Sequence, residues 1–362
     1  MKIIPWSKPH LNNKDRKYLN KAFDSTWISD GRYVRDFEKK IQKNTNRKFA
    51  IATSSGTTAI HLAYLSLGLK RNDEIVIPAY GYMACANIAK LMNLKVIFCD
   101  VDVGSYCASL KNIKEVISKK TKAVVVINTY GNMSENLKIS NFLKKKKIYF
   151  IEDAAESLGS KISNIASGKF GDISTFSFHA TKNVTTGEGG MILTDNPKLQ
   201  KKIKLFRSHG VDKARYKHLV YGHNFRMSNL LASIGYSQSK RINSINKQKV
   251  NLYQLYLKYL NLDKINLQDF FNNKKIVPWT FAFTLKKGFD VKKLSLFLLR
   301  NKIESRNGFY SPGRLSLYKI KRNLYKASDF LSANVICLPF YLELKEKNIK
   351  YICSKINSFL NN

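Results

Sequence analysis

The stretch from Gly171 to Gly190 reads GDISTFSFHATKNVTTGEGG. Its first part, residues 173–178, is a short apolar run typical of a buried strand, and the part after Lys182 is a glycine-rich turn. A lysine held away from water is a useful nucleophile, because desolvation favours the neutral amine. On this stretch alone, a solvated lysine beside a surface loop fits equally well.

A second signal is an acid at the end of another apolar run. Residues 148–151 are followed by Glu152, Asp153, two alanines and Glu156. An aspartate at the carboxyl end of a buried strand can keep a ring nitrogen protonated, which makes a pyridinium ring an electron sink. By itself, Asp153 is explained equally well as a helix cap.

A third signal is a turn rich in serine, glycine and threonine. Residues 50–53 are apolar, the turn contains Ser55, Gly56 and Thr57, and residues 60–67 follow with helical spacing. A strand, a tight turn and a helix N-terminus together offer backbone N–H groups and hydroxyls to a phosphate. A phosphate-binding turn, an acid at a strand end, and a lysine between a strand and a glycine-rich turn, in this order along one chain, predict a site for pyridoxal phosphate.

Strand-like and helical runs alternate along the first half of the chain. Apolar runs occur at residues 49–53, 74–77, 95–99, 123–127 and 148–151, and helical runs lie between them at 58–67, 82–92, 110–118 and 136–145. This rhythm predicts an α/β fold whose central sheet is mainly parallel and covered on both faces. Ligands of such sheets bind beyond the carboxyl ends of the strands.

The second half of the chain has a different pattern. Residues 227–260 read as one long helix leading to a second domain, 276–285 alternate like an antiparallel strand, and 291–300 and 349–359 read as helices. Residues 272–275 read as an exposed loop. We therefore expect a large cofactor-binding domain at 1–240 and a smaller α+β C-terminal domain at 241–362.

The motifs resemble those of a known family. The matching segments are Ser55-Gly56-Thr57, Pro78 with Tyr82, residues 152–156, Ser177 with Lys182, residues 186–190 and residues 222–227. In these segments, and over nearly the whole chain, the sequence resembles the DegT/DnrJ/EryC1/StrS family of pyridoxal-phosphate-dependent sugar aminotransferases. The resemblance implies the fold type I of these transferases.

The resemblance also implies a role for each site residue. Lys182 would bind the cofactor covalently and carry a proton between substrate and cofactor, and Asp153 would pair with the ring nitrogen. The other implied cofactor contacts are Ser55, Gly56, Thr57 and Ser177 at the phosphate, Tyr82 over the ring, Glu156 near the 3-oxygen, and Asn224 at the phosphate of a neighbouring subunit. The family pattern therefore implies a homodimer with shared active sites.

The implied reaction moves an amino group from glutamate to C4 of a nucleotide-linked 4-keto-6-deoxy sugar, with the cofactor in its PMP form during turnover. The first acceptor to expect is GDP-linked 4-keto-6-deoxymannose, a precursor for O-antigen and polysaccharide biosynthesis. His179, Tyr310 and Arg314 are the expected substrate contacts. Arg314 and Asn128 stand where relatives tend to have histidine, so dTDP- or UDP-linked sugars and amination at C3 remain alternatives.

Two other readings of the same fold are weaker. Sugar 3-dehydratases of this family replace the lysine with histidine, whereas this chain has Lys182. A non-catalytic regulator on the same scaffold has no need for both Asp153 and Lys182.

Composition sets the remaining expectations. The formal charge of +38 is typical of nucleic-acid-binding proteins. The lysines are spread along the chain, however, and the dense runs at 144–147 and 201–202 lack interleaved aromatic residues. We therefore expect no specific nucleic-acid partner. A positive field would still attract a doubly charged nucleotide sugar.

Localisation follows from what the sequence lacks. It has no run of ~20 apolar residues and no signal-peptide pattern at its start. Its five cysteines and six histidines show no paired spacing typical of disulfides or metal sites. The sequence therefore predicts a cytoplasmic protein with buried free thiols, no membrane anchor and no metal.

Overall fold

The computed structural model describes residues 2–212, 216–270 and 274–361. In this part of the chain, a seven-stranded sheet has the order β1-β9-β8-β5-β4-β2-β3. Its strands are β1 (Phe49–Thr53), β2 (Glu74–Pro78), β3 (Lys95–Cys99), β4 (Thr121–Ile127), β5 (Tyr149–Asp153), β8 (Ile173–Ser177) and β9 (Gly190–Thr194). Only β9 runs antiparallel to its neighbours, so the mainly parallel sheet expected from the sequence is confirmed.

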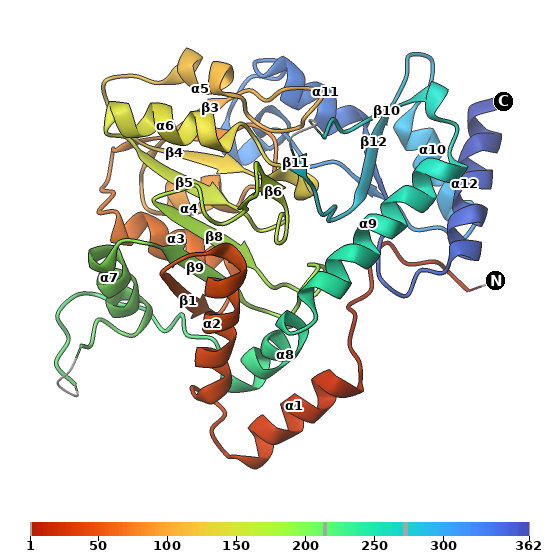
Figure 1. Cartoon of the computed structure of the whole chain (residues 1–362). Coiled ribbons are helices and arrows are strands. Elements are labelled where there is room, and N and C mark those ends of the chain that lie inside the picture. Colours follow the sequence, from red (N-terminus) through yellow and green to blue (C-terminus); the bar gives the residue numbers. More distant parts are fainter. Residues whose placement is uncertain (1, 213–215, 271–273, 362) are drawn as a thin grey trace.

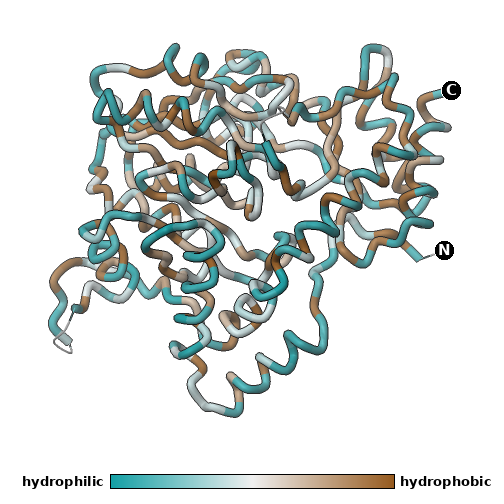
Figure 2. Tube along the Cα trace, in the orientation of Figure 1, coloured by the Kyte–Doolittle hydropathy of each residue, from teal (hydrophilic) through white to brown (hydrophobic). Residues whose placement is uncertain are grey.

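Helices cover both faces of this sheet. They are α2 (Arg32–Thr45), α3 (Gly56–Ser66), α4 (Ala84–Leu91), α5 (Leu110–Val116), α6 (Asn136–Lys146), α7 (Pro197–Arg207) and α8 (Asn229–Ser239). α1 (Asn13–Asp24) packs against α8 on the outside of this layer (Figure 1). Ile75 and Ile77 of β2 belong to the apolar cluster with α3 and α4, whereas Val76 belongs to the cluster with α5 and α6. Alternate strand residues thus point to opposite faces, and both faces are buried (Figures 1 and 2).

Several helices begin at a residue that caps them. The Ser55 side chain accepts from the Thr58 N–H at the start of α3, and Asn196 caps α7 immediately before Pro197. Asp290 accepts from two N–H groups at the start of α10 (Val291–Arg300). Such caps supply partners for the free donors of the first turn, and α10 begins at the residue that the sequence predicts.

A second sheet, which is antiparallel, lies beside the first. It has the order β10-β12-β14-β13, with strands β10 (Ile265–Leu267), β12 (Phe281–Leu285), β13 (Arg306–Asn307) and β14 (Val335–Leu338). The helices α9 (Ile242–Tyr259), α10, α11 (Lys326–Asn334) and α12 (Glu346–Asn361) accompany it. Ile4 forms a parallel bridge with Ile303, and both belong to the apolar cluster between the second sheet and its helices. The N-terminal segment therefore lies against this part of the molecule (Figure 1).

Three local expectations were wrong. Residues 227–260 form two helices rather than one, because the backbone of Arg241 is not helical and its guanidinium pairs with Asp15 at 2.6 Å. Within 276–285, only β12 is a strand. Lys274 and Lys275 form β11, which pairs with β6 (Lys161–Ile162) beside β7 (Ile165–Ala166), while 271–273 lie outside the described residues.

The five cysteines are all buried and unpaired, as the sequence predicts. Across the three described ranges, no helix combines the length and the apolar character that crossing a membrane requires.

Candidate active site

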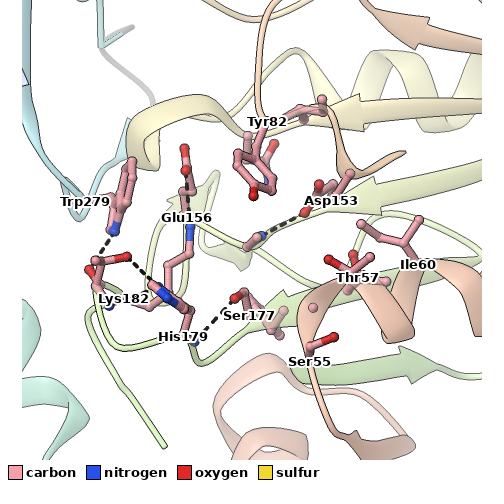
Figure 3. A pocket seen from close by; sticks show the side chains of 18 of the residues that line it. Ser55, Thr57, Ile60, Tyr82, Asp153, Glu156, Ser177, His179, Lys182 and Trp279 are labelled. Atoms are coloured by element: carbon pink, nitrogen blue, oxygen red, sulfur yellow. Dashed lines mark hydrogen bonds and ion pairs between the residues drawn. The ribbon is translucent and has the colours of Figure 1, made fainter. Parts of the chain in front are cut away.

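A pocket of about 500 Å³ lies at the carboxyl ends of the central strands (Figure 3). Asp153 ends β5, Ser177 ends β8, and the turn at Ser55 follows β1. Lys182 follows β8 by five residues and lines the same pocket. Parallel strands end at one edge of a sheet, so residues far apart in sequence converge there.

The wall of the pocket near α3 has the geometry of a phosphate site. Gly56 and Thr57 open α3, and Ser177 lies opposite them (Figure 3). A Cβ atom on Gly56 would lie 2.9 Å from the Ser177 Cβ, so the approach of the two backbones requires glycine. The free backbone N–H groups in the first turn of α3 and the hydroxyls of Thr57 and Ser177 are donors suited to a phosphate.

Gly56→Ala is expected to weaken the binding of pyridoxal phosphate by about ten-fold or more, because the added methyl group pushes Ser177 and α3 apart. Titration of the apoprotein with cofactor, followed by absorbance, measures this effect. Gly104→Ala in an exposed loop is the matched control, since its Cβ would meet an Asp102 side-chain oxygen at 3.3 Å and the Asp269 Cβ at 3.7 Å and no backbone atom closer than these. Unchanged cofactor affinity in Gly56→Ala would contradict the assignment.

Asp153 lies deep in the pocket with 5% of its surface exposed. Its Oδ1 accepts from the Ala155 N–H at 3.1 Å, and its Oδ2 accepts from the Cys85 thiol at 3.3 Å. Burial raises the pKa of Asp153, and the two hydrogen bonds oppose that shift only in part. A cation placed beside this carboxylate, such as a protonated ring nitrogen, would offset the cost of its burial.

Lys182 ends between a carboxylate and an aromatic ring. Its Nζ lies 3.2 Å from Glu156 Oε1 and 4.2 Å from the centroid of the Trp279 ring. The other carboxylate oxygen of Glu156 accepts from the Tyr130 N–H at 2.9 Å. Burial raises the pKa of Glu156, and the charge of Lys182 opposes this. The surface-lysine alternative does not hold, because Lys182 is partly buried and paired.

Two further residues expected from the sequence line the mouth of the pocket. Tyr82 is 65% exposed and its ring packs edge-on against Phe309. The His179 ring contacts the Thr181 hydroxyl at 3.0 Å, and its other nitrogen lies 3.7 Å from the Glu188 carboxylate. Both side chains are thus placed to meet a ligand that enters the pocket (Figure 3).

Three expected residues do not line this pocket. Asn224 is exposed, accepts from the Arg226 guanidinium at 3.1 Å and bridges Ser208 through its backbone. Tyr310 and Arg314 are exposed as well, and Phe309 contacts the pocket instead. Their assigned roles therefore stay predictions.

Sequence reasoning gave no role to several side chains that line the pocket, and three of them are aromatic. Trp6, Trp279 and Phe309 reach it from the first residues and from the C-terminal part of the chain, and no periodicity marks them. Asn128, which stands where relatives tend to have histidine, also lines the pocket, and its Nδ2 donates to Glu152 and to Ser157, each at 3.0 Å.

A model of the DegT/DnrJ/EryC1/StrS aminotransferase family matches residues 9–357. The chain belongs to this family. It is therefore an enzyme, an aminotransferase that depends on pyridoxal phosphate. The residues at the pocket fit this cofactor, since a donor-rich helix start, a buried acid and a paired lysine face one cavity.

Individual relatives cover the whole chain. It is 34% identical to a GDP-perosamine synthase of Escherichia coli O157:H7 over 99% of both proteins. It is 33% identical to a GDP-perosamine synthase of Vibrio cholerae over 99% of this chain and 100% of that protein. A putative sugar aminotransferase from Streptococcus pneumoniae, solved in its PMP form, superposes with a TM-score of 0.94 at 20% identity, covering 99% of each chain. The last comparison shows the shared fold.

Proposed function

We propose that this aminotransferase moves an amino group from glutamate to C4 of a nucleotide-linked 4-keto-6-deoxy sugar, with GDP-linked 4-keto-6-deoxymannose as its acceptor. The observation that carries the proposal is the full-length similarity to two GDP-perosamine synthases at 33–34% identity. The convergence of Lys182, Asp153 and the phosphate-binding turn in one pocket supports it.

In this proposal each residue of the pocket has a distinct task. Bound pyridoxal phosphate supplies an electron sink for the carbon that loses or gains a proton. The phosphate-binding set is Ser55, Gly56, Thr57 and Ser177. Asp153 would hold the ring nitrogen protonated, Tyr82 would contact the ring, and Glu156 would act near its 3-oxygen.

Lys182 is the residue that moves protons. Its Nζ would take the proton from the α-carbon of the amino donor and pass it to the cofactor, and in the second half-reaction it would carry a proton from the cofactor to C4 of the sugar. Glu156 orients the amine through the contact at 3.2 Å. Trp279 and Phe309 close the pocket on the side of the C-terminal sheet and exclude water from the amine.

The active assembly is proposed to be a homodimer. Asn224 lies outside its own pocket and is exposed, so it is free to reach the phosphate of a second subunit. Leu219 and the fully exposed Tyr221 of the same segment offer apolar surface for such a contact. Sedimentation of the holoenzyme at assay concentration tests this, and a fully active monomer would refute it.

The sugar nucleotide contacts are proposed to be His179, Tyr310 and Arg314. A guanidinium such as that of Arg314 can bind a diphosphate through paired hydrogen bonds. The excess of lysine over acid gives the surroundings a positive field that favours the same ligand.

Product analysis decides the acceptor. The enzyme is incubated with glutamate and with GDP-, dTDP- or UDP-linked 4-keto-6-deoxy sugars, and kcat/KM is compared by mass spectrometry of the amino sugars. We expect the GDP-linked sugar to be preferred by about ten-fold or more. A preference for a dTDP- or UDP-linked sugar would overturn the acceptor and leave the aminotransferase intact. Colourless protein that yields no product after addition of cofactor would favour a regulator on the same scaffold.

A further inference from the structure

Trp279 and Glu156 enclose the charged end of Lys182. The Nζ atom has the Glu156 carboxylate at 3.2 Å on one side and the face of the indole ring at 4.2 Å on the other (Figure 3). A cation over the face of a tryptophan is stabilised by the ring quadrupole, and more strongly so where water is excluded. Trp279 is 8% exposed, so this contact lies in the interior.

The indole ring is held in place from several directions. Its Nε1 donates to the carbonyl of Thr181 at 2.9 Å, next to the lysine itself. The ring stacks on Tyr130 and packs edge-on against Trp6. The backbone N–H of Trp279 donates to the Tyr130 carbonyl at 3.1 Å. The ring is therefore fixed relative to the lysine rather than a mobile cover.

One residue links the two sides of this enclosure. Tyr130 accepts from the backbone of Trp279 through its carbonyl and donates its own N–H to Glu156 Oε2 at 2.9 Å. Its φ of 57° lies in the left-handed region, which is costly for a side chain of this size. The backbone at Tyr130 is thus bent in a way that lets it hold both the carboxylate and the indole.

We propose that Trp279 and Glu156 form a binding site for the free ammonium group of Lys182. This inference rests on the proposed function. In the half-reaction with glutamate, the amino group would pass to the cofactor, water would supply the keto oxygen of the 2-oxoglutarate that leaves, and the Lys182 amine would be released and protonated by protons from the donor ammonium group and that water. The site holds that ammonium group until the amine is needed again, and it thereby stabilises the aminated form of the enzyme.

Three other titratable side chains line the pocket near Lys182. Asp153 ends the strand that Glu156 follows, and His179 and Glu188 lie on the loop that carries the lysine. Among the described residues, Glu156 alone forms an ion pair with the Lys182 Nζ. Trp279 is therefore the partner whose removal changes the stability of the ammonium group without removing a charge.

The proposal is tested by an equilibrium rather than by a rate. Holoenzyme is mixed with fixed ratios of glutamate to 2-oxoglutarate, from both directions, and the two cofactor forms are measured by absorbance. Borohydride reduction followed by mass spectrometry gives the fraction joined to Lys182. Trp279→Leu is expected to shift the equilibrium about ten-fold toward the form in which Lys182 is joined to the cofactor.

Two variants keep the test decisive. Trp279→Phe retains a ring face, but phenylalanine binds cations less strongly than tryptophan. It is therefore expected to shift the equilibrium by about two- to three-fold toward the form in which Lys182 is joined to the cofactor. Trp27→Phe is the matched control, since Trp27 is 70% exposed and does not line the pocket, and no shift is expected. An unchanged equilibrium in both Trp279 variants would overturn the proposal. If the wild-type enzyme does not exchange with glutamate, the donor assignment has failed instead, and the same equilibrium is measured with whichever amino acid does exchange.

Discussion

Lys182→Ala is expected to lower kcat/KM for sugar amination by about 10⁴-fold, because among the residues that the structure describes no other lysine lines the pocket. The variant keeps the phosphate-binding turn and Asp153, so it is expected to retain pyridoxal phosphate without a covalent link. Steady-state kinetics and the absorbance of the bound cofactor measure the two effects.

The control for this variant is Lys138→Ala. Lys138 is exposed on α6 and pairs with Glu135 at 2.6 Å, so its loss is expected to leave activity unchanged. A rival for the catalytic amine is Lys249, since burial lowers its pKa to about 7. Its Nζ instead donates to the Phe340 carbonyl at 2.9 Å, and it does not line the pocket. Reduction with borohydride that labelled Lys249, and not Lys182, would reverse the assignment.

Asp153→Asn is expected to reduce kcat/KM by about 10³-fold. A neutral amide cannot hold a ring nitrogen protonated, and leaving a buried cation without its partner costs about 3–5 kcal/mol. The measurement is kinetic, with the binding of cofactor determined separately to exclude simple loss of the holoenzyme. Activity within ten-fold of the wild type would contradict the role of Asp153.

The same substitution is expected to stabilise the apoprotein at neutral pH. Burial raises the pKa of Asp153, so the folded apoprotein holds a proton more tightly than the unfolded chain does. Stability therefore falls as the pH rises from the usual range of carboxylates through this raised pKa. Asparagine removes that cost, which should raise Tm at pH 7 and raise it less at pH 4.

Calorimetry of the apoprotein at the two pH values checks this expectation. Asp263→Asn is the control, because Asp263 is exposed. A variant at Asp153 that melts lower than the wild type at pH 7 would show that the hydrogen bonds from Ala155 and Cys85 outweigh the cost of burial.

The sequence by itself determined the parts of this protein that depend on local spacing. Strands 49–53 and 95–99 and helix 291–300 have the predicted bounds, because apolar periodicity and capping residues act over a few neighbours. The short motifs around Gly56, Asp153 and Lys182 also identified one edge of the sheet, since each follows a strand. Their resemblance to a family identified the chemistry.

Only the tertiary structure decided what depends on contacts between distant residues. The break between α8 and α9 lies at Arg241, which forms an ion pair with Asp15. These two residues are 226 positions apart in the sequence. The end of the Lys182 side chain meets Trp279, which lies 97 positions further along the chain and carries no motif. Such contacts arise where segments far apart in the sequence pack together, and no local pattern encodes which side chain arrives there.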